Sequence, residues 1–303
     1  MKNITLSLLA GLGLLIAAPT SAHAKLNIFA CEPEWDALAE EIGGDLVTVY
    51  TATKATQDVH HMRAKPSLLA AMRKADLVFC SGASLEVGWL PILIQKAGGP
   101  NVQPETSGWL MAADYVDKLE VMAHADRSMG HVHPEGNPHI HLNPHNIEQV
   151  AKVLADRLSL LDQTNAKIYA AHLDTFERKW QGLTKTWESQ ATGLRGKQVV
   201  VYHKSWAYLA DWTGIKIAGT LEPKPGLPPT TAHLEKLLQS LKGEKVTAIL
   251  VAPYEDEDAA EWLSSQTGIP ILHLPYTVGG SSEAKTLEGL FNETIRKLKE
   301  TAS

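Results

Sequence analysis

The sequence has few cysteines, few aromatic residues and little excess charge. Of its 303 residues, two are cysteine, 6% are aromatic, 28 are Lys or Arg and 34 are Asp or Glu, so the formal net charge is −6. This mild acidity argues against a nucleic-acid-binding protein, which needs basic surfaces to neutralise phosphates. Glycine and proline are near their average frequencies, which excludes collagen-like and disordered chains. The length leaves room for about two domains.

Long apolar runs are also absent, apart from one near the N-terminus. Residues 1–24 carry the basic Lys2 near their start, then the apolar run Leu6–Ala18, and they end in the small-x-small sequence Ala22-His23-Ala24. This order is typical of a cleavable secretory signal, and the run is short for a membrane span of ~20 residues. We expect cleavage after Ala24 and a soluble periplasmic or secreted protein. A retained membrane anchor is the alternative, whereas lipid attachment is not expected because no cysteine stands at the cleavage point.

The expected compartment is oxidising, so the two cysteines can form a disulfide there. Cys31 and Cys80 each end a short apolar run that predicts a buried parallel strand. Neighbouring strands would bring the two residues within disulfide distance. We expect a Cys31–Cys80 disulfide, while two buried free thiols or a soft metal ligand are alternatives.

Strand patterns alternate with helix patterns in both halves of the chain. This alternation predicts an α/β fold of two lobes, each with a mainly parallel sheet flanked by helices. The strands are expected at Leu26–Cys31, Leu46–Thr51, Leu77–Cys80, Gln198–Tyr202, Ile215–Thr220, Val246–Val251 and Ile269–Leu274. The helices are expected at Glu34–Ile42, Pro66–Ala75, Leu85–Ala97, Ser205–Trp212, Thr231–Leu241, Asp256–Thr267 and Ser282–Lys299.

One long helix is expected between the lobes. Asn146–Gln190 has no proline and only Gly182 as a glycine, and its apolar residues recur every three or four positions. The expected organisation is therefore a signal peptide (1–24), an N-terminal lobe (25–145), a linking helix (146–192) and a C-terminal lobe (193–303).

The histidines gather at three places. Six of the thirteen lie in or beside a loop at 124–141: His124, His131, His133, His139, His141 and His145. His60 and His61 lie in the connection after the second expected strand, and His203 follows the expected strand at 198–202. Ligands in open α/β sheets bind beyond the carboxyl ends of strands, and imidazole suits Zn²⁺. The distribution predicts that histidines from these places form one zinc site in a cleft between the two lobes. A single loop histidine such as His124 is more often simply exposed to solvent.

Short motifs in this order resemble the periplasmic solute-binding proteins of zinc and manganese ABC importers (cluster A-I, or cluster 9). Asp58-Val59-His60 with Pro66-Ser67 is similar to that family's Asp-Pro-His and Pro-Ser. Residues 137–144, Asn-Pro-His-Ile-His-Leu-Asn-Pro, resemble its Asp-Pro-His-x-Trp-Leu-Asp-Pro. Tyr202-His203 and Tyr254-Glu255-Asp256 are similar to its strand-end histidine and its Phe-x-Glu.

The resemblance implies that His60, His139 and His203 are the metal ligands and that a histidine-rich loop (His124–His133) precedes the second one. Three histidines imply Zn²⁺ as the transported ion, with Mn²⁺ or Fe²⁺ as the alternative. The fourth ligand departs from the family, because Leu274–Gly280 lacks the Asp found in many relatives and Val59 replaces the Glu found in others. Water or one of four side chains is expected there: Asp256, His141, His61 or Glu222.

The expected partners are a divalent metal ion and an ABC permease in the inner membrane, and a monomer is expected. The rival function is a secreted zinc hydrolase, because three protein ligands and an open position also describe catalytic zinc. The sequence lacks His-Glu-x-x-His and Gly-x-Ser-x-Gly, and no cysteine stands beside a histidine. We therefore expect a binding protein and not an enzyme.

Overall fold

The computed structural model describes residues 24–123, 130 and 132–301. The expected signal peptide, apart from Ala24, and two loop histidines, His124 and His131, lie outside these residues. No helix in the described ranges is both long enough and apolar enough to cross a bilayer.

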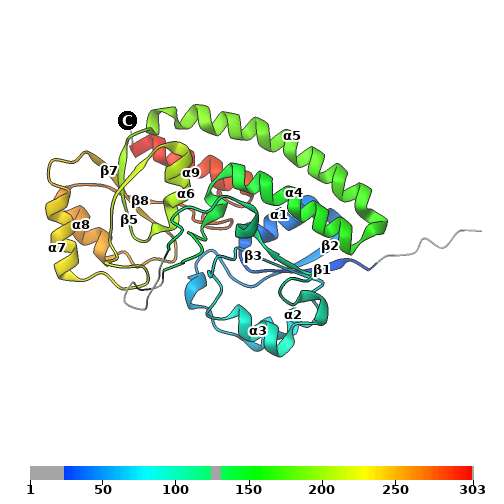
Figure 1. The fold of residues 1–303 in the computed structure, drawn as a ribbon. Helices are drawn as coiled ribbons and strands as arrows, with labels where there is room; N and C mark the ends of the chain where they lie inside the picture. The colour runs from blue at the N-terminus through cyan, green and yellow to red at the C-terminus, as the bar shows by residue number, and fades with distance from the viewer. Residues whose placement is uncertain (1–23, 124–129, 131, 302–303) are drawn as a thin grey trace, which may run out of the picture.

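The N-terminal lobe is built on a four-stranded parallel sheet in the order β2-β1-β3-β4. Helix α1 covers one face of this sheet, and α2 and α3 cover the other (Figure 1). The strands are β1 (Leu26–Ala30), β2 (Val47–Thr51), β3 (Leu77–Cys80) and β4 (Trp109–Met111), and the helices are α1 (Pro33–Gly43), α2 (Pro66–Met72) and α3 (Leu90–Ala97).

The C-terminal lobe repeats this design with the order β6-β5-β7-β8, again entirely parallel. The two sheets confirm the predicted α/β fold of two lobes. The strands are β5 (Gln198–Val201), β6 (Lys216–Thr220), β7 (Val246–Val251) and β8 (Ile271–His273), and the helices are α6 (Ala207–Thr213), α7 (Thr231–Ser240), α8 (Asp258–Thr267) and α9 (Leu287–Thr301).

The segment between the lobes forms two helices, whereas the sequence pattern predicted one helix across Asn146–Gln190. Helix α4 (Pro144–Leu161) ends at a turn, and α5 (Ala166–Ala191) runs back along it and across both lobes (Figure 1). The side chain of Asp162 accepts hydrogen bonds from the Asn165 amide side chain (2.7 Å) and the Tyr169 hydroxyl (3.0 Å). Side-chain hydrogen bonds of this kind compete with the helix, so the chain reverses without a glycine or proline.

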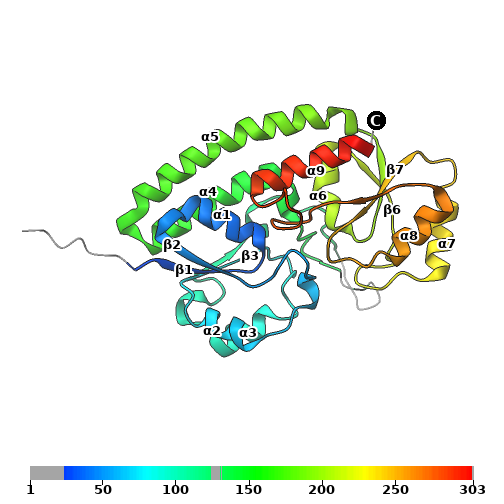
Figure 2. The same ribbon diagram turned by 180° about the vertical axis from the view of Figure 1, so that it is seen from behind.

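One apolar core extends from the first sheet to the second beneath α4 and α5. In its middle, the Trp180 ring lies 5.1 Å from that of Trp187, which stacks on Phe291 of α9 at 4.8 Å. Figure 2 shows α9 lying beside α5 over the junction of the lobes. Because packed interiors resist deformation, this shared core limits how far the lobes can move apart.

Two smaller differences from the predicted elements have local causes. Strand β4, which pairs with β3, has only three residues, too few to show an alternating pattern. Helix α3 starts at Leu90 and not at Leu85, because Pro91 fits the first turn of a helix, where its missing N–H is not needed.

The predicted disulfide is present. Cys31 follows β1 and Cys80 ends β3, and the two are bonded with their Cα atoms 4.8 Å apart. Both residues are fully buried in the apolar cluster under α2 and α3. The bond closes a long segment of chain, since 49 positions separate the two cysteines.

Removing the disulfide should destabilise the protein. Because a cross-link of this span restricts the unfolded chain, the double variant Cys31→Ala/Cys80→Ala should lose about 2–4 kcal/mol in its free energy of unfolding. Urea denaturation followed by tryptophan fluorescence measures the loss. An unchanged midpoint relative to the oxidised wild type would contradict this stabilising role.

Candidate metal centre

Three histidines from distant parts of the chain meet between the lobes. His60 lies in the 3-10 turn Val59–His61 after β2, His139 directly precedes the 3-10 turn Ile140–Leu142, and His203 follows β5. All three pairs of rings have their centres 5.5 Å apart. One ligand nitrogen from each ring lies within 4.8 Å of the other two, which is close enough for the three to share one ion.

Short turns fix the backbone at two of these histidines. The Asp58 carboxylate accepts a hydrogen bond from the His60 backbone N–H at 2.9 Å, and the Asn137 side chain accepts one from the His139 N–H at 3.0 Å. Asp and Asn favour such turns, because their side chains reach the backbone two residues ahead. The motifs Asp58-Val59-His60 and Asn137-Pro138-His139 thus present their histidines in the same way.

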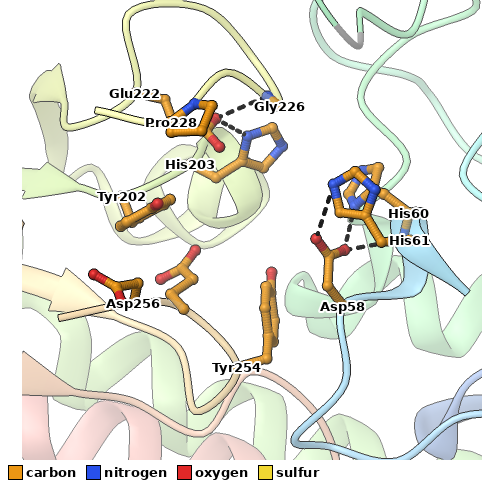
Figure 3. A pocket seen from close by; sticks show the side chains of 11 residues that line it. Asp58, His60, His61, Tyr202, His203, Glu222, Gly226, Pro228, Tyr254 and Asp256 are labelled. Atoms are coloured by element: carbon orange, nitrogen blue, oxygen red, sulfur yellow. Dashed lines mark hydrogen bonds and ion pairs between the residues drawn. The ribbon is translucent and has the colours of Figure 1, made fainter. Parts of the chain in front are cut away.

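Every ring of the triad has a partner at Nδ1. His60 Nδ1 is 2.9 Å from Asp58 Oδ1, His203 Nδ1 is 2.8 Å from Glu222 Oε2 (Figure 3), and His139 Nδ1 is 2.6 Å from the Tyr276 hydroxyl. A neutral imidazole whose Nδ1–H donates to an oxygen keeps a lone pair on Nε2. Partners of this kind fix the tautomer and orientation of metal-binding histidines.

The ring of His139 has a buried nitrogen that a ligand in the space between the three rings could satisfy. Its side chain is 1% exposed, and its Nε2 is buried without a hydrogen-bond partner among the described residues. Burial, with the neighbouring His203 and His60, holds the pKa of His139 well below its usual value. Burial also lowers the pKa of His60, although Asp58 opposes this shift. Both shifts favour the neutral rings that bind metal ions.

Negative charge lies directly behind the rings. Burial alone would raise the pKa of Asp58, but its hydrogen bond to His60 lowers the pKa overall, so this carboxyl group is ionised near neutral pH. The Glu222 carboxylate lies 2.8 Å from His203 Nδ1. The two carboxylates can therefore offset the charge of a divalent cation without touching it. Glu255 differs, because burial raises its pKa to about 8.

The comparisons with known proteins agree with this geometry. The family described as ZnuA, the periplasmic component A of a zinc-uptake complex, matches residues 28–301. The chain belongs to this family. Its members are the substrate-binding proteins of ABC importers, so the chain is an extracytoplasmic metal-binding protein and not an enzyme, and the hydrolase interpretation is set aside.

Similar proteins cover most of the chain at low sequence identity. The metal ABC transporter substrate-binding lipoprotein ScbA of Streptococcus cristatus is 24% identical over 280 residues, which are 89% of this chain and 87% of ScbA. The manganese ABC transporter substrate-binding lipoprotein PsaA of Streptococcus mitis is 23% identical, with 88% and 85% covered. A crystal structure of ZnuA superposes with a TM-score of 0.77 at 23% identity, covering 92% of this chain and all of that one. The Cd-bound periplasmic metal-binding protein of Candidatus Liberibacter asiaticus superposes at 0.74 with 19% identity and the same coverage.

Two of the side chains considered as fourth ligands support other parts of the ZnuA fold. His141 is fully buried, with Nε2 2.9 Å from the Tyr276 carbonyl oxygen and Nδ1 3.1 Å from Glu34. The Asp256 side chain accepts a hydrogen bond from the Asp258 backbone N–H at 3.0 Å, where α8 begins. Figure 3 shows Asp256 beside Tyr202, across the pocket from His60.

The other two lie near the triad but face different groups. Glu222 accepts hydrogen bonds from His203 and from the Gly226 backbone N–H. The His61 side chain is 57% exposed, and its Nε2 is 3.6 Å from Asp58. The group of mutually close ligand atoms in the described cleft therefore consists of imidazole nitrogens alone.

Sequence reasoning assigned no individual role to two residues of the site, Tyr276 and His133. Tyr276 lies in the loop where many relatives have an Asp, and this position could have indicated that Tyr276 lies at the site. His133 was grouped with the loop histidines, but its Nε2 is 3.2 Å from His60 Nε2.

A second cluster, Cys31, Cys80 and Glu86, also has ligand atoms close together. Its two sulfurs are bonded to each other, so this cluster offers no thiolate to a metal ion.

The carboxylates behind the rings should matter for metal affinity. Glu222→Gln keeps the side-chain volume but removes the negative charge, and we expect it to weaken metal binding about 10- to 100-fold. Competition against a chromophoric chelator measures the change. Asp256→Asn, which lines the same pocket, is the matched control and should leave affinity unchanged. Equal affinities for Glu222→Gln and wild type would contradict the role given to this carboxylate.

Proposed function

We propose that the chain captures Zn²⁺ through His60, His139 and His203 and delivers it to an ABC permease in the inner membrane. The observation that carries this proposal is the convergence of three imidazoles, each with a partner at Nδ1 and with one nitrogen per ring lying within 4.8 Å of the other two. Neutral imidazole binds Zn²⁺ at ~2.0–2.1 Å, and rings sharing one such ion stand about 5 Å apart, as these do.

The donor set favours zinc over manganese. Mn²⁺ prefers carboxylate, carbonyl and water oxygens, whereas imidazole suits Zn²⁺. The nearest carboxylates, Asp58 and Glu222, are engaged by His60 and His203 on the sides away from Nε2. Manganese is the second candidate, because several relatives are named as manganese transporter components.

Capture requires little rearrangement of the protein. The rings of His60 and His203 have side chains 13% and 12% exposed, so an ion can reach the triad from the pocket while His139 forms its floor. Prior orientation of the rings reduces the cost of ordering them on binding. Release to the permease then requires the lobes or the ring partners to shift.

Native mass spectrometry tests the proposal. Metal-free protein mixed with equimolar Zn²⁺ and Mn²⁺ should retain one zinc ion. His60→Ala, His139→Ala and His203→Ala should each lose most of it, because each removes a direct ligand. His145→Ala, an exposed histidine paired with Glu188, is the control and should bind as the wild type does. A manganese adduct would favour the second candidate, and zinc retained by all three triad variants would overturn the proposed site.

Proton release gives an independent check. Zinc displaces any proton that a ligand carries. Because the pKa values of His139 and His60 are lowered, both rings carry less protonation at about pH 6 than ordinary histidines do. Zinc binding at that pH should therefore release fewer protons than three ordinary histidines would. Calorimetry in two buffers with different ionisation enthalpies counts the protons, and a release equal to that of three ordinary histidines would contradict the lowered pKa values.

A further inference from the structure

A fourth imidazole stands at the edge of the triad. The ring centre of His133 lies 5.3 Å from that of His60, close to the 5.5 Å separations within the triad, and 6.4 Å from that of His139. His133, His139 and His203 line one pocket together. His133 therefore approaches the same space as the three rings, from a different segment.

The contact between His133 and His60 joins the two Nε2 atoms at 3.2 Å. His60 Nδ1–H donates to Asp58, so His60 Nε2 carries a lone pair and faces the His133 ring. In a tetrahedral site with Zn–N bonds of ~2.0–2.1 Å, two ligand nitrogens are about 3.3–3.4 Å apart. The observed separation is that of a hydrogen bond from His133 Nε2–H to His60 Nε2. It is also close to that of two nitrogens bound to one zinc ion, which would displace this proton.

The segment that carries His133 is held by backbone hydrogen bonds. The His133 carbonyl oxygen accepts from Gly136 N–H at 3.0 Å, and the Pro134 carbonyl oxygen accepts from Met122 N–H at 3.1 Å. Gly136 has φ +119°, a conformation that favours glycine. This turn directly precedes the Asn137 turn that sets His139, so the two imidazoles are positioned together.

The other protein groups considered for the fourth position are engaged elsewhere or exposed. His141 is packed between Tyr276 and Glu34, Asp256 supports the start of α8, Glu222 supports His203, and His61 lies mainly in solvent. A structural zinc-type coordination sphere takes four ligands, and the mutually close group in the described cleft supplies three. His133 lies just outside this group and against His60, so it would have to move towards the ion to complete the sphere.

We propose that His133 is the fourth zinc ligand and closes the three-histidine site over the bound ion. This proposal rests on the proposed function. A site of four imidazoles leaves no position for water or for a carboxylate, which disfavours Mn²⁺ further. Since His133 comes from the loop side of the cleft, its binding also covers the ion and should slow its dissociation.

The test compares His133→Ala with wild type by zinc competition, by the rate of zinc transfer to an excess of chelator and by the visible spectrum of bound Co²⁺. Removing the hydrogen-bond partner of a ligand typically weakens metal binding about 10- to 100-fold. Loss of a direct ligand should therefore weaken zinc binding at least 10-fold and speed zinc dissociation by a similar factor. The Co²⁺ spectrum should change as water replaces a nitrogen. Added imidazole should restore the wild-type spectrum, because it can fill the space left by the ring.

The controls separate this proposal from the proposed function. His61→Ala, next to His60 and also a histidine of the cleft, should match wild type in all three measurements. His60→Ala should abolish binding. If His60→Ala abolishes binding while His133→Ala leaves affinity, dissociation rate and Co²⁺ spectrum unchanged, the fourth position is held by water and His133 is not a ligand. If His60→Ala, His139→Ala and His203→Ala all bind zinc as wild type does, the proposed function itself fails.

Discussion

The orientation of three imidazoles governs the rest of this structure. A histidine ring can present either nitrogen, and only an acceptor at Nδ1 commits Nε2 to the cleft. Asp58 and Glu222 supply that acceptor to His60 and His203 from within their own lobes. His139 depends on Tyr276, which lies 137 positions further along the chain. The site is therefore complete only when the two lobes are correctly joined.

A buried polar network holds the lobes in this arrangement. Glu34 of α1 receives a hydrogen bond from the Thr277 hydroxyl and lies 3.1 Å from His141 Nδ1, while His141 Nε2 donates to the Tyr276 carbonyl oxygen. Burying such groups costs desolvation free energy, so the network contributes more to position than to stability. Since the hydroxyl of the same Tyr276 lies 2.6 Å from His139 Nδ1, the network that joins the lobes also orients one ring of the site.

The sequence predicted those features of the fold and of the site that depend on short stretches of neighbouring residues. Strand and helix periodicity indicated both sheets, and the Asx–His motifs and the strand-end His203 indicated the three rings. Asp162 ended a helix without glycine or proline, and β4 was too short to show a pattern. The approach of Tyr276 to His139, and of His133 to His60, depends on how distant segments pack, so no spacing in the chain revealed either contact.

The position of the carboxylates explains how one fold can serve different metal ions. A carboxylate in direct contact with the ion supplies the oxygen that Mn²⁺ prefers, whereas one bonded to the far nitrogen of an imidazole supplies charge but leaves nitrogen as the donor. Here Asp58 and Glu222 take the second position, and the loop in which the resemblance would place an Asp has Tyr276 and Thr277 instead. At the proposed site, these two carboxylates face a divalent cation across two rings, so they offset its charge while nitrogen remains the donor. The proposed preference for zinc therefore rests on where the carboxylates lie, and not on how many there are.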